Sequence, residues 1–351
     1  MSHNNTESTK KLAELASETR FAGPLWLREE VGALYAKGEV HTGPFSMPLL
    51  RMANFDKLSL PSENRNLRML DLCCGSGVTT HELQVLLQQQ GLEDKVDLVC
   101  GDFSAGQLEY LDKRIQRMGW RNTVTRQMNA ERNGEPDMSF DHVVCAQGLM
   151  IIPDSQAALQ DCYRVLKPGG TFALSVWYTE NWILDVRDAV AQLPGLPNWP
   201  QTSLELTNSW AQGPWEDPHY VKSMLHRRGF VDIDVQTKII MIPLKDAEDF
   251  YEVYDAFIEW VADRYWTEGE RKRCKPLLRD AVVGFMERKY GRGRPFSIEK
   301  VCILGTARRP GCRTERASAL SDAECSPKVE FADQKYEYKI WQIEYITSVG
   351  L

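Results

Sequence analysis

The sequence has no long hydrophobic run, no excess of positive charge and no apolar segment near its start. None of its apolar stretches approaches the ~20 residues that a membrane-spanning helix requires, so we expect no membrane span. The formal net charge of -7 disfavours nucleic acid as a partner, because affinity for a phosphate backbone depends on Lys and Arg. The polar N-terminus is not typical of a secretory signal, which favours a cytoplasmic protein.

Cysteine is present, but not with the spacing of a metal site. The nine cysteines are scattered, and no CxxC pair is matched by a second one, so we expect no metal. Several fall inside apolar runs, where a free thiol packs as a small hydrophobe. This usage favours reduced thiols in a cytosolic compartment.

Short apolar runs alternate with helical patterns over much of the chain. Strands are predicted at 68–74, 95–102, 122–128, 140–146, 171–178, 231–244 and 296–309. Between the second and third of these, Ser104 and Gln107 form an S-x-x-Q capping box that begins a helix. Strands that alternate with helices indicate a mostly parallel sheet covered on both faces. The expected fold class is therefore α/β, a Rossmann-like seven-stranded sheet with additional helical cover.

The same patterns divide the chain into segments. Residues 1–20 are expected to be flexible, and 21–66 to form an N-terminal helical cover. Residues 67–309 are expected to form the main domain, in which helices at about 245–292 would form a lid over a substrate. Residues 310–351 are a C-terminal extension to which the sequence assigns no role.

The stretch "MLDLCCGSG" places glycines where the first strand meets a helix. Gly75 and Gly77 leave backbone N–H groups open to a ligand, at a helix end that favours negative charge. The dinucleotide fingerprint G-x-G-x-x-G would need a third glycine at Thr80, which disfavours a nicotinamide cofactor. Asp102 and Asn129 end the next two strands, and the carboxyl ends of parallel strands form the ligand-binding edge of such sheets.

Four blocks in order carry a family resemblance: "MLDLCCGSG", "GDFSAGQLEYL", "NAERNGEPDMSFDHVV" and "CYRVLKPGG". Together they resemble the class I S-adenosylmethionine-dependent methyltransferases, with the ubiquinone/menaquinone C-methyltransferase-like group and its small-molecule relatives as the nearest type. The resemblance covers residues 68–178 closely and 214–308 loosely. It implies S-adenosyl-L-methionine as the cofactor and a small-molecule substrate.

The resemblance also implies a set of cofactor-binding positions. They are Asp71, Gly75, Ser76, Gly77, Asp102, Phe103, Gln107, Asn129, Ala130, Ala146 and Gln147. Asp102 matches the acid that binds the ribose, and Asn129 and Ala130 match the pair beside the adenine. Two positions depart from the family pattern: Cys73 replaces the first glycine of D-x-G-x-G-x-G, and Ala146 replaces a residue that often carries a hydroxyl.

Catalytic and substrate-binding residues have weaker signals. Of the six histidines, His41 and His219 lie in segments expected to cover the sheet edge, so we consider them as general bases. An aromatic-lined pocket would suit a flat or apolar metabolite of secondary or quinone-like metabolism. The candidates for its walls are Tyr35, Trp177, Tyr178, Trp215 and Phe257.

Two alternatives to small-molecule methylation stay open. Residues 264–300 contain eleven Lys or Arg against five Asp or Glu, a basic segment that an RNA methyltransferase could use. The cofactor motifs also report binding rather than transfer, so the chain could act as a regulator or a non-methylating catalyst. The sequence carries no signal for the oligomeric state or for the atom that receives the methyl group.

Overall fold

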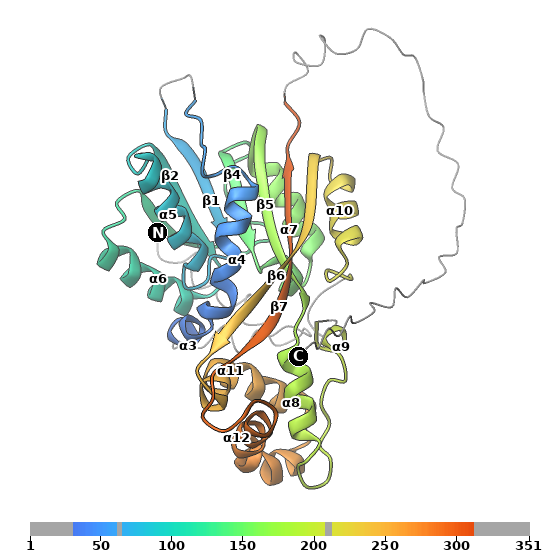
Figure 1. The fold of residues 1–351 in the computed structure, drawn as a ribbon. Helices are drawn as coiled ribbons and strands as arrows, with labels where there is room; N and C mark the ends of the chain where they lie inside the picture. The colour runs from blue at the N-terminus through green and yellow to red at the C-terminus, as the bar shows by residue number, and fades with distance from the viewer. Residues whose placement is uncertain (1–30, 62–64, 208–212, 312–351) are drawn as a thin grey trace, which may run out of the picture. The chain divides into compact units, whose positions relative to one another are not determined.

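The computed structural model describes residues 31–61, 65–207 and 213–311. Its centre is a seven-stranded sheet with the order β3-β2-β1-β4-β5-β7-β6 (Figure 1). The strands are β1 (Leu67–Leu72), β2 (Val96–Asp102), β3 (Thr123–Gln127), β4 (Phe140–Ala146), β5 (Leu166–Thr179), β6 (Val231–Leu244) and β7 (Phe296–Arg308). The first five are parallel, and β7 is antiparallel to both of its neighbours. The expected α/β fold class is confirmed.

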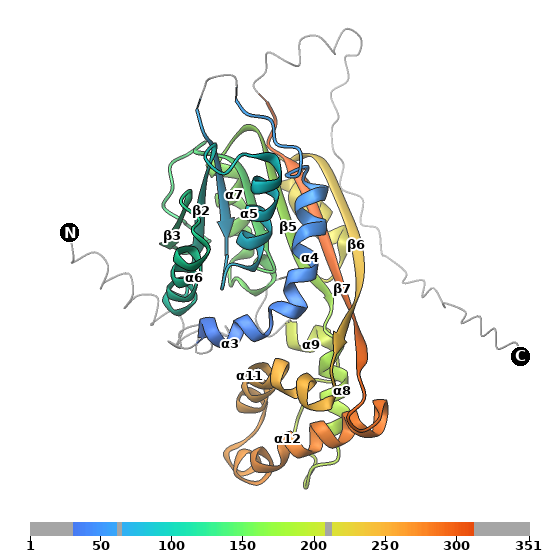
Figure 2. The same cartoon turned by 60° about the vertical axis from the view of Figure 1, so that its left-hand side comes forward.

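Helices cover both faces of this sheet. The helices of the described chain are α3 (Val31–Lys37), α4 (Glu39–Met52), α5 (Val78–Gln90), α6 (Ala105–Met118), α7 (Ser155–Val165), α8 (Trp182–Val190), α9 (Ser203–Thr207), α10 (Pro218–Arg227), α11 (Ala247–Tyr265) and α12 (Glu268–Tyr290), with a 3-10 turn η1 (Leu149–Ile151). In Figure 2, α4 and α5 lie on the near face and α7 on the far face. Opposite faces are expected, because right-handed crossovers leave β1 in one direction and β4 in the other.

Local signals explain where several helices begin and end. Gly91 and Gly119 end α5 and α6 in the left-handed conformation. The Ser104 side chain accepts a hydrogen bond from Gln107 N and caps α6, as predicted. The reciprocal half of the predicted capping box is wrong, because Ser104 N donates to Asp102 Oδ1 at 2.8 Å instead. The Gln107 side chain therefore takes no part in capping α6.

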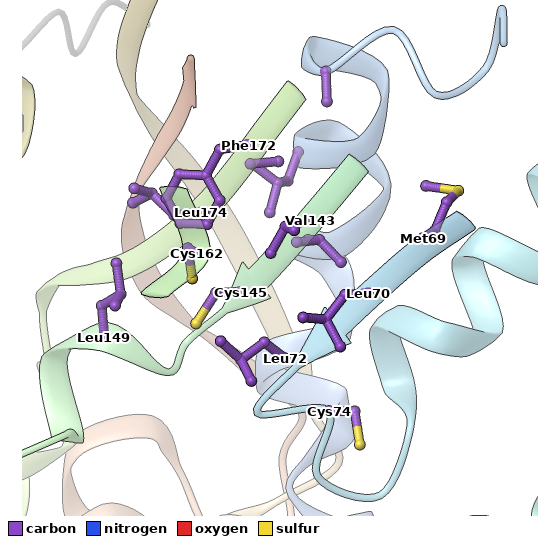
Figure 3. Close-up of a cluster of buried hydrophobic side chains, with 14 of the residues drawn as sticks. Met69, Leu70, Leu72, Cys74, Val143, Cys145, Leu149, Cys162, Phe172 and Leu174 are labelled. Carbon is purple, nitrogen blue, oxygen red and sulfur yellow. The ribbon is translucent and has the colours of Figure 1, made fainter. Parts of the chain in front are cut away.

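The main hydrophobic core lies between the sheet and its helices. Figure 3 shows its centre, where apolar side chains of β1, β4 and β5 meet. Leu70, Val143 and Phe172 are fully buried there, and the thiols of Cys145 and Cys162 pack among them. The seven cysteines in the described part of the chain are free, which agrees with their expected use as small hydrophobes.

A second hydrophobic cluster lies beyond one end of the sheet. It joins α8, α11 and α12 with the ends of β6 and β7 nearest to these helices, through residues such as Phe250, Ile242 and Ile298. Figure 1 shows these helices grouped below the sheet. The sequence had predicted lid helices only at about 245–292, whereas α8 from an earlier part of the chain belongs to the same cluster.

Two further observations concern the limits of the described chain. No helix within the described ranges is long and apolar enough to cross a membrane. The predictions for residues 1–20 and for nearly all of 310–351 lie outside the described residues.

Candidate cofactor and substrate site

A cavity of about 340 Å³ opens at the carboxyl edge of the sheet. The loops that follow β1, β2, β3 and β4 form one side of it, and α3 and α4 close the other. Its walls include Tyr35, Thr42, Ser46, Cys73, Gly75, Asp102, Phe103, Gln107, Met128, Asn129, Ala130, Glu131, Ala146, Gln147, Ile151 and Asp154. Eight of the eleven positions implied by the resemblance are among them, which are Gly75, Asp102, Phe103, Gln107, Asn129, Ala130, Ala146 and Gln147.

The loop after β1 has the backbone that close approach to a ligand requires. Gly77 has φ 86°, and a Cβ at this position would lie 2.3 Å from Leu111 Cδ1, so only glycine fits. A Cβ on Gly75 would meet Gln107 and Tyr35 at 3.8 Å, an ordinary contact distance, and Gly75 itself lines the cavity. Cys73 and Gln147 also have positive φ, both 58°, and both line the cavity. Strained non-glycine residues of this kind concentrate at functional sites.

Asp102 joins two parts of the cavity wall. Its Oδ2 accepts from Gly75 N at 2.9 Å and its Oδ1 from Ser104 N at 2.8 Å. Burial raises the pKa of this carboxyl, and the backbone N–H groups of Ser104, Gly75 and Phe103 oppose that rise. A carboxylate offers about four lone pairs, and these three N–H groups take three of them, so one remains for a hydroxyl group of a ligand.

Asn129 and Ala130 follow β3 on the same edge. Asn129 Oδ1 accepts from Glu131 N at 2.9 Å, which fixes a turn and holds the segment against the cavity. Asparagine at the end of a strand commonly forms a turn. The structure places it in a turn that is itself part of the cavity wall.

Asp71, Ser76 and Gly77 support the loop without lining the cavity. Asp71 is 1% exposed and accepts from Thr80 Oγ1 at 2.6 Å, which connects β1 to the first turn of α5. Burial raises the pKa of Asp71 to about 7, partly offset by the Thr80 hydrogen bond. Ser76 Oγ donates to Glu39 Oε1 at 2.6 Å, and Arg114 Nη1 donates to the same oxygen at 2.7 Å.

Buried polar atoms without partners show what kind of ligand the cavity fits. Gln107, Gln147 and Thr42 all line it. Within the described part of the chain, the buried side-chain oxygen of each (Oε1, Oε1 and Oγ1) lacks a hydrogen-bond partner. Leaving such atoms unpaired costs about 1–3 kcal/mol each. S-adenosylmethionine carries an ammonium, two ribose hydroxyls and an adenine amino group, so its donors match these oxygens. The residues present fit this cofactor.

A second cavity of about 80 Å³ adjoins the first. The two share Tyr35, Thr42, Gln147 and Ile151. Its other walls are Gly38, His41, Met150, Trp177, Glu180, Trp182, Leu206, Val253, Tyr254, Phe257, Trp260 and Lys300. Side chains from both hydrophobic clusters therefore enclose it, most of them aromatic or apolar.

The structure divides the predicted substrate residues into two groups. Tyr35, Trp177 and Phe257 line the second cavity. Tyr178 does not, because alternation along β5 turns it outward and leaves it 42% exposed. Trp215 packs into the main core instead, with Nε1 donating to Ser155 Oγ at 3.1 Å. These two placements correct the prediction.

The structure also places the two histidine candidates in different surroundings. His41 is 4% exposed and lines the second cavity. His219 lies exposed in the first turn of α10, where its backbone N–H donates to the helix cap Asp217 at 2.8 Å. It lines neither cavity, so the structure gives it no place in the site.

Sequence reasoning missed the charged pair of the second cavity. Lys300 Nζ lies 2.6 Å from Glu180 Oε2, and the two side chains are 2% and 10% exposed. A signal for Lys300 existed in the sequence, since alternation along "SIEKVCILG" places it on the same face as the apolar Ile298 and Cys302. Thr42 and Met128 of the first cavity had no comparable signal.

The fold and the cavity at its carboxyl edge define a class I S-adenosylmethionine-dependent methyltransferase, with S-adenosylmethionine as its cofactor. Residues 53–185 match the model of the ubiE/COQ5 methyltransferase family. The chain is therefore a methyltransferase that uses S-adenosylmethionine, as the resemblance in the four motif blocks had indicated.

Known proteins with similar sequences or structures include two from fungi. Methyltransferase tpcH of Aspergillus fumigatus is 29% identical over 71% of this chain and 87% of its own length. Acetylaranotin bis-thiomethyltransferase of Aspergillus terreus is 28% identical over 82% of this chain and 97% of its own. Among solved structures, phosphoethanolamine N-methyltransferase 2 of Haemonchus contortus aligns with a TM-score of 0.48 and 15% identity, covering 80% of this chain and 57% of that one.

Proposed function

We propose that this enzyme methylates a small apolar or aromatic metabolite that binds in the second cavity. The observation that carries the proposal is the shared wall of the two cavities, formed by Tyr35, Thr42, Gln147 and Ile151. A molecule in the aromatic chamber would lie directly beside the cofactor. Cavities of this lining suit flat or apolar ligands.

The residues of the first cavity have separate tasks in this proposal. The Gly75 loop supports the methionine part of the cofactor, Asp102 accepts from the ribose hydroxyls, and Asn129 with Ala130 borders the adenine. When bound, the cofactor supplies a sulfonium whose methyl group leaves by in-line displacement. The protein's contribution is alignment of the two reactants, which is worth roughly 7–11 kcal/mol of the barrier.

The names of two relatives support a small-molecule substrate. One is a bis-thiomethyltransferase of acetylaranotin, and another is a demethylmenaquinone methyltransferase of Geobacillus stearothermophilus, 35% identical over 29% of this chain and 42% of its own length. Their names give different small organic substrates, so the shared expectation is a small organic molecule rather than one particular compound.

The test is methyl transfer by the purified full-length chain. It is incubated with S-adenosylmethionine and a panel of phenols, hydroquinones, β-diketones and aryl thiols, and release of S-adenosylhomocysteine is measured. We expect turnover on some members of the panel. Turnover on RNA or protein alone would contradict the proposal, and cofactor binding without release on any substrate would favour the regulatory alternative.

Several cations of the basic segment that suggested RNA form ion pairs within the protein. Lys275 lies 2.6 Å from Asp263 Oδ1, Lys289 lies 2.5 Å from Asp185 Oδ1, and Arg279 forms an ion pair with Glu248. Lys300 is buried beside Glu180. These cations are largely neutralised by acidic neighbours, so the structure offers no specific observation in favour of RNA methylation.

A further inference from the structure

The second cavity contains one imidazole whose two nitrogens have different surroundings. Nδ1 of His41 lies 2.9 Å from the Tyr254 hydroxyl oxygen. Nε2 is buried and has no hydrogen-bond partner among the residues that the structure describes. An unpaired buried polar group costs about 1–3 kcal/mol, which favours a ligand that pairs with Nε2.

The Tyr254 hydroxyl determines which nitrogen carries the proton. Burial raises the pKa of Tyr254 well above its usual value, so the hydroxyl keeps its hydrogen. Within the described chain, His41 Nδ1 is the partner that can accept this hydrogen. A neutral imidazole accepts at Nδ1 only when its proton is on Nε2. The opposite tautomer would bury the tyrosine hydrogen without an acceptor.

Lys300 provides a reason for this imidazole to stay neutral. Its Nζ lines the same cavity, 4.2 Å from the centre of the Trp177 ring and 5.6 Å from that of Tyr254. Burial, and then the positive charge of Lys300, lower the pKa of His41 to about 3. Such a group is a poor proton acceptor in neutral solution, so the general-base role considered from the sequence is not favoured.

We propose that His41 donates a hydrogen bond from Nε2 to an oxygen of the substrate, so that the site selects molecules with a carbonyl, enolate or phenolate oxygen. The inference rests on the proposed methyl transfer for the identity of the ligand as a substrate. The other titratable groups that face the cavity are Tyr35 from α3, Tyr254 from α11, Glu180 after β5 and Lys300 from β7. Lys300 is paired with Glu180, so the selection depends on the hydrogen bond from His41.

The tautomer is tested without any ligand. Full-length protein labelled with ¹⁵N-histidine is studied by long-range ¹H–¹⁵N correlation, and the His41 signals are identified by their loss in His41→Gln. We expect a neutral ring with its proton on Nε2 from about pH 5.5 to about pH 8. Tyr254→Phe should yield a mixture of tautomers. A proton on Nδ1, or an imidazolium that forms near pH 6, would overturn the proposal.

Selectivity is tested with a matched pair of probes, p-cresol and toluene, which differ by one hydroxyl. Their affinities are measured by ligand-observed NMR with S-adenosylhomocysteine present. We expect the wild type to prefer p-cresol, and His41→Phe to weaken p-cresol binding by about tenfold while toluene binding is unchanged. His41→Gln, which keeps an N–H donor, should retain part of the preference.

Two outcomes would contradict the selectivity. Equal affinity of the wild type for both probes, or unchanged p-cresol affinity in His41→Phe, would overturn it. Unchanged S-adenosylhomocysteine affinity in all variants shows that the fold is intact. If the enzyme methylated nothing in the wider panel, the proposed function would fail while the tautomer and the probe preference could still be observed, so the two failures are distinguishable.

Discussion

At the scale of single residues, the cofactor cavity depends on a few residues that also hold its loops in place. Asp102 holds the Gly75 loop and the start of α6 with both oxygens, while one lone pair remains for a ligand. Cys73 occupies a left-handed backbone position where the family has glycine, so its strain is a cost that the surrounding packing offsets. The sequence showed this cysteine as a departure from the family pattern, and the structure shows that it has the positive φ that glycine adopts more easily.

The first prediction concerns Asp102→Asn. The new amide group would place N–H donors opposite the backbone N–H of Gly75 or Ser104, and it removes an acceptor for the ribose. We expect roughly tenfold to hundredfold weaker S-adenosylmethionine binding by calorimetry. Asp97→Asn is the control, because Asp97 is exposed on the same strand. Equal affinities of Asp102→Asn and wild type would contradict the ribose assignment.

The second prediction concerns the pH dependence of stability at Asp71. Its pKa is raised to about 7, above the unfolded value of 3.8, so its favourable contribution is full below about pH 4 and is lost as pH rises to about 7. Asp71→Asn does not titrate. As pH rises from about 4 to about 7, the free energy of unfolding of Asp71→Asn should therefore increase by roughly 2–4 kcal/mol relative to that of the wild type.

Denaturant unfolding at several pH values measures this difference. Thr80→Val provides a second variant. Removing the hydroxyl that donates to Asp71 should raise the pKa of Asp71 further, so the loss of stability should occur at higher pH. Parallel pH curves for the wild type and Asp71→Asn would contradict a raised pKa.

At the scale of elements, α4, α6 and the loop after β1 are connected through one carboxylate. Glu39 at the start of α4 accepts from Ser76 of the loop and from Arg114 of α6. The helical cover is therefore anchored to the cofactor loop by polar contacts as well as by packing. Both partly buried side chains of the ion pair are 19% exposed or less.

The third prediction follows from this connection. Glu39→Gln should weaken cofactor binding roughly threefold to tenfold, because the cover would hold the loop less firmly. Glu109→Gln on α6 removes an exposed ion pair with Lys113 and should have no effect. Stopped-flow dissociation of the cofactor measures both. A Glu39→Gln variant with wild-type dissociation would show that the contact does not restrain the loop.

At the scale of the whole molecule, the two hydrophobic clusters support different parts of the site. The cluster around the sheet holds the cofactor loops, and the cluster of α8, α11 and α12 supplies much of the second cavity. Substrate binding should therefore depend on the second cluster more than cofactor binding does. A location in the cytosol stays a prediction from composition.

The fourth prediction compares one fully buried phenylalanine from each cluster. Phe250→Ala should destabilise the protein by about 3–5 kcal/mol and abolish most turnover, while S-adenosylmethionine affinity is retained. Phe172→Ala, of similar cost, should lower cofactor affinity as well because it loosens the sheet. Calorimetry and product release measure the two effects. Equal loss of cofactor affinity in both variants would contradict the assignment of the two clusters to cofactor and substrate binding.

The sequence by itself determined the strands, their helices and the polar residues at the strand ends. Alternation and glycine spacing are local properties, and parallel strands bring their carboxyl ends to one edge. It therefore predicted Asp102 and Asn129 at one site. It could not place β7 between β5 and β6, because α11 and α12 separate β7 from β6 in the chain.

Only the tertiary structure decided which distant side chains meet in the second cavity. His41, Tyr254, Glu180 and Lys300 come from four separate parts of the chain, and no local pattern relates them. The packing of α4 and α11 over the sheet edge brings them together. The same packing sets the burial that keeps His41 neutral, so its chemistry is a property of the assembled fold rather than of its neighbours in sequence.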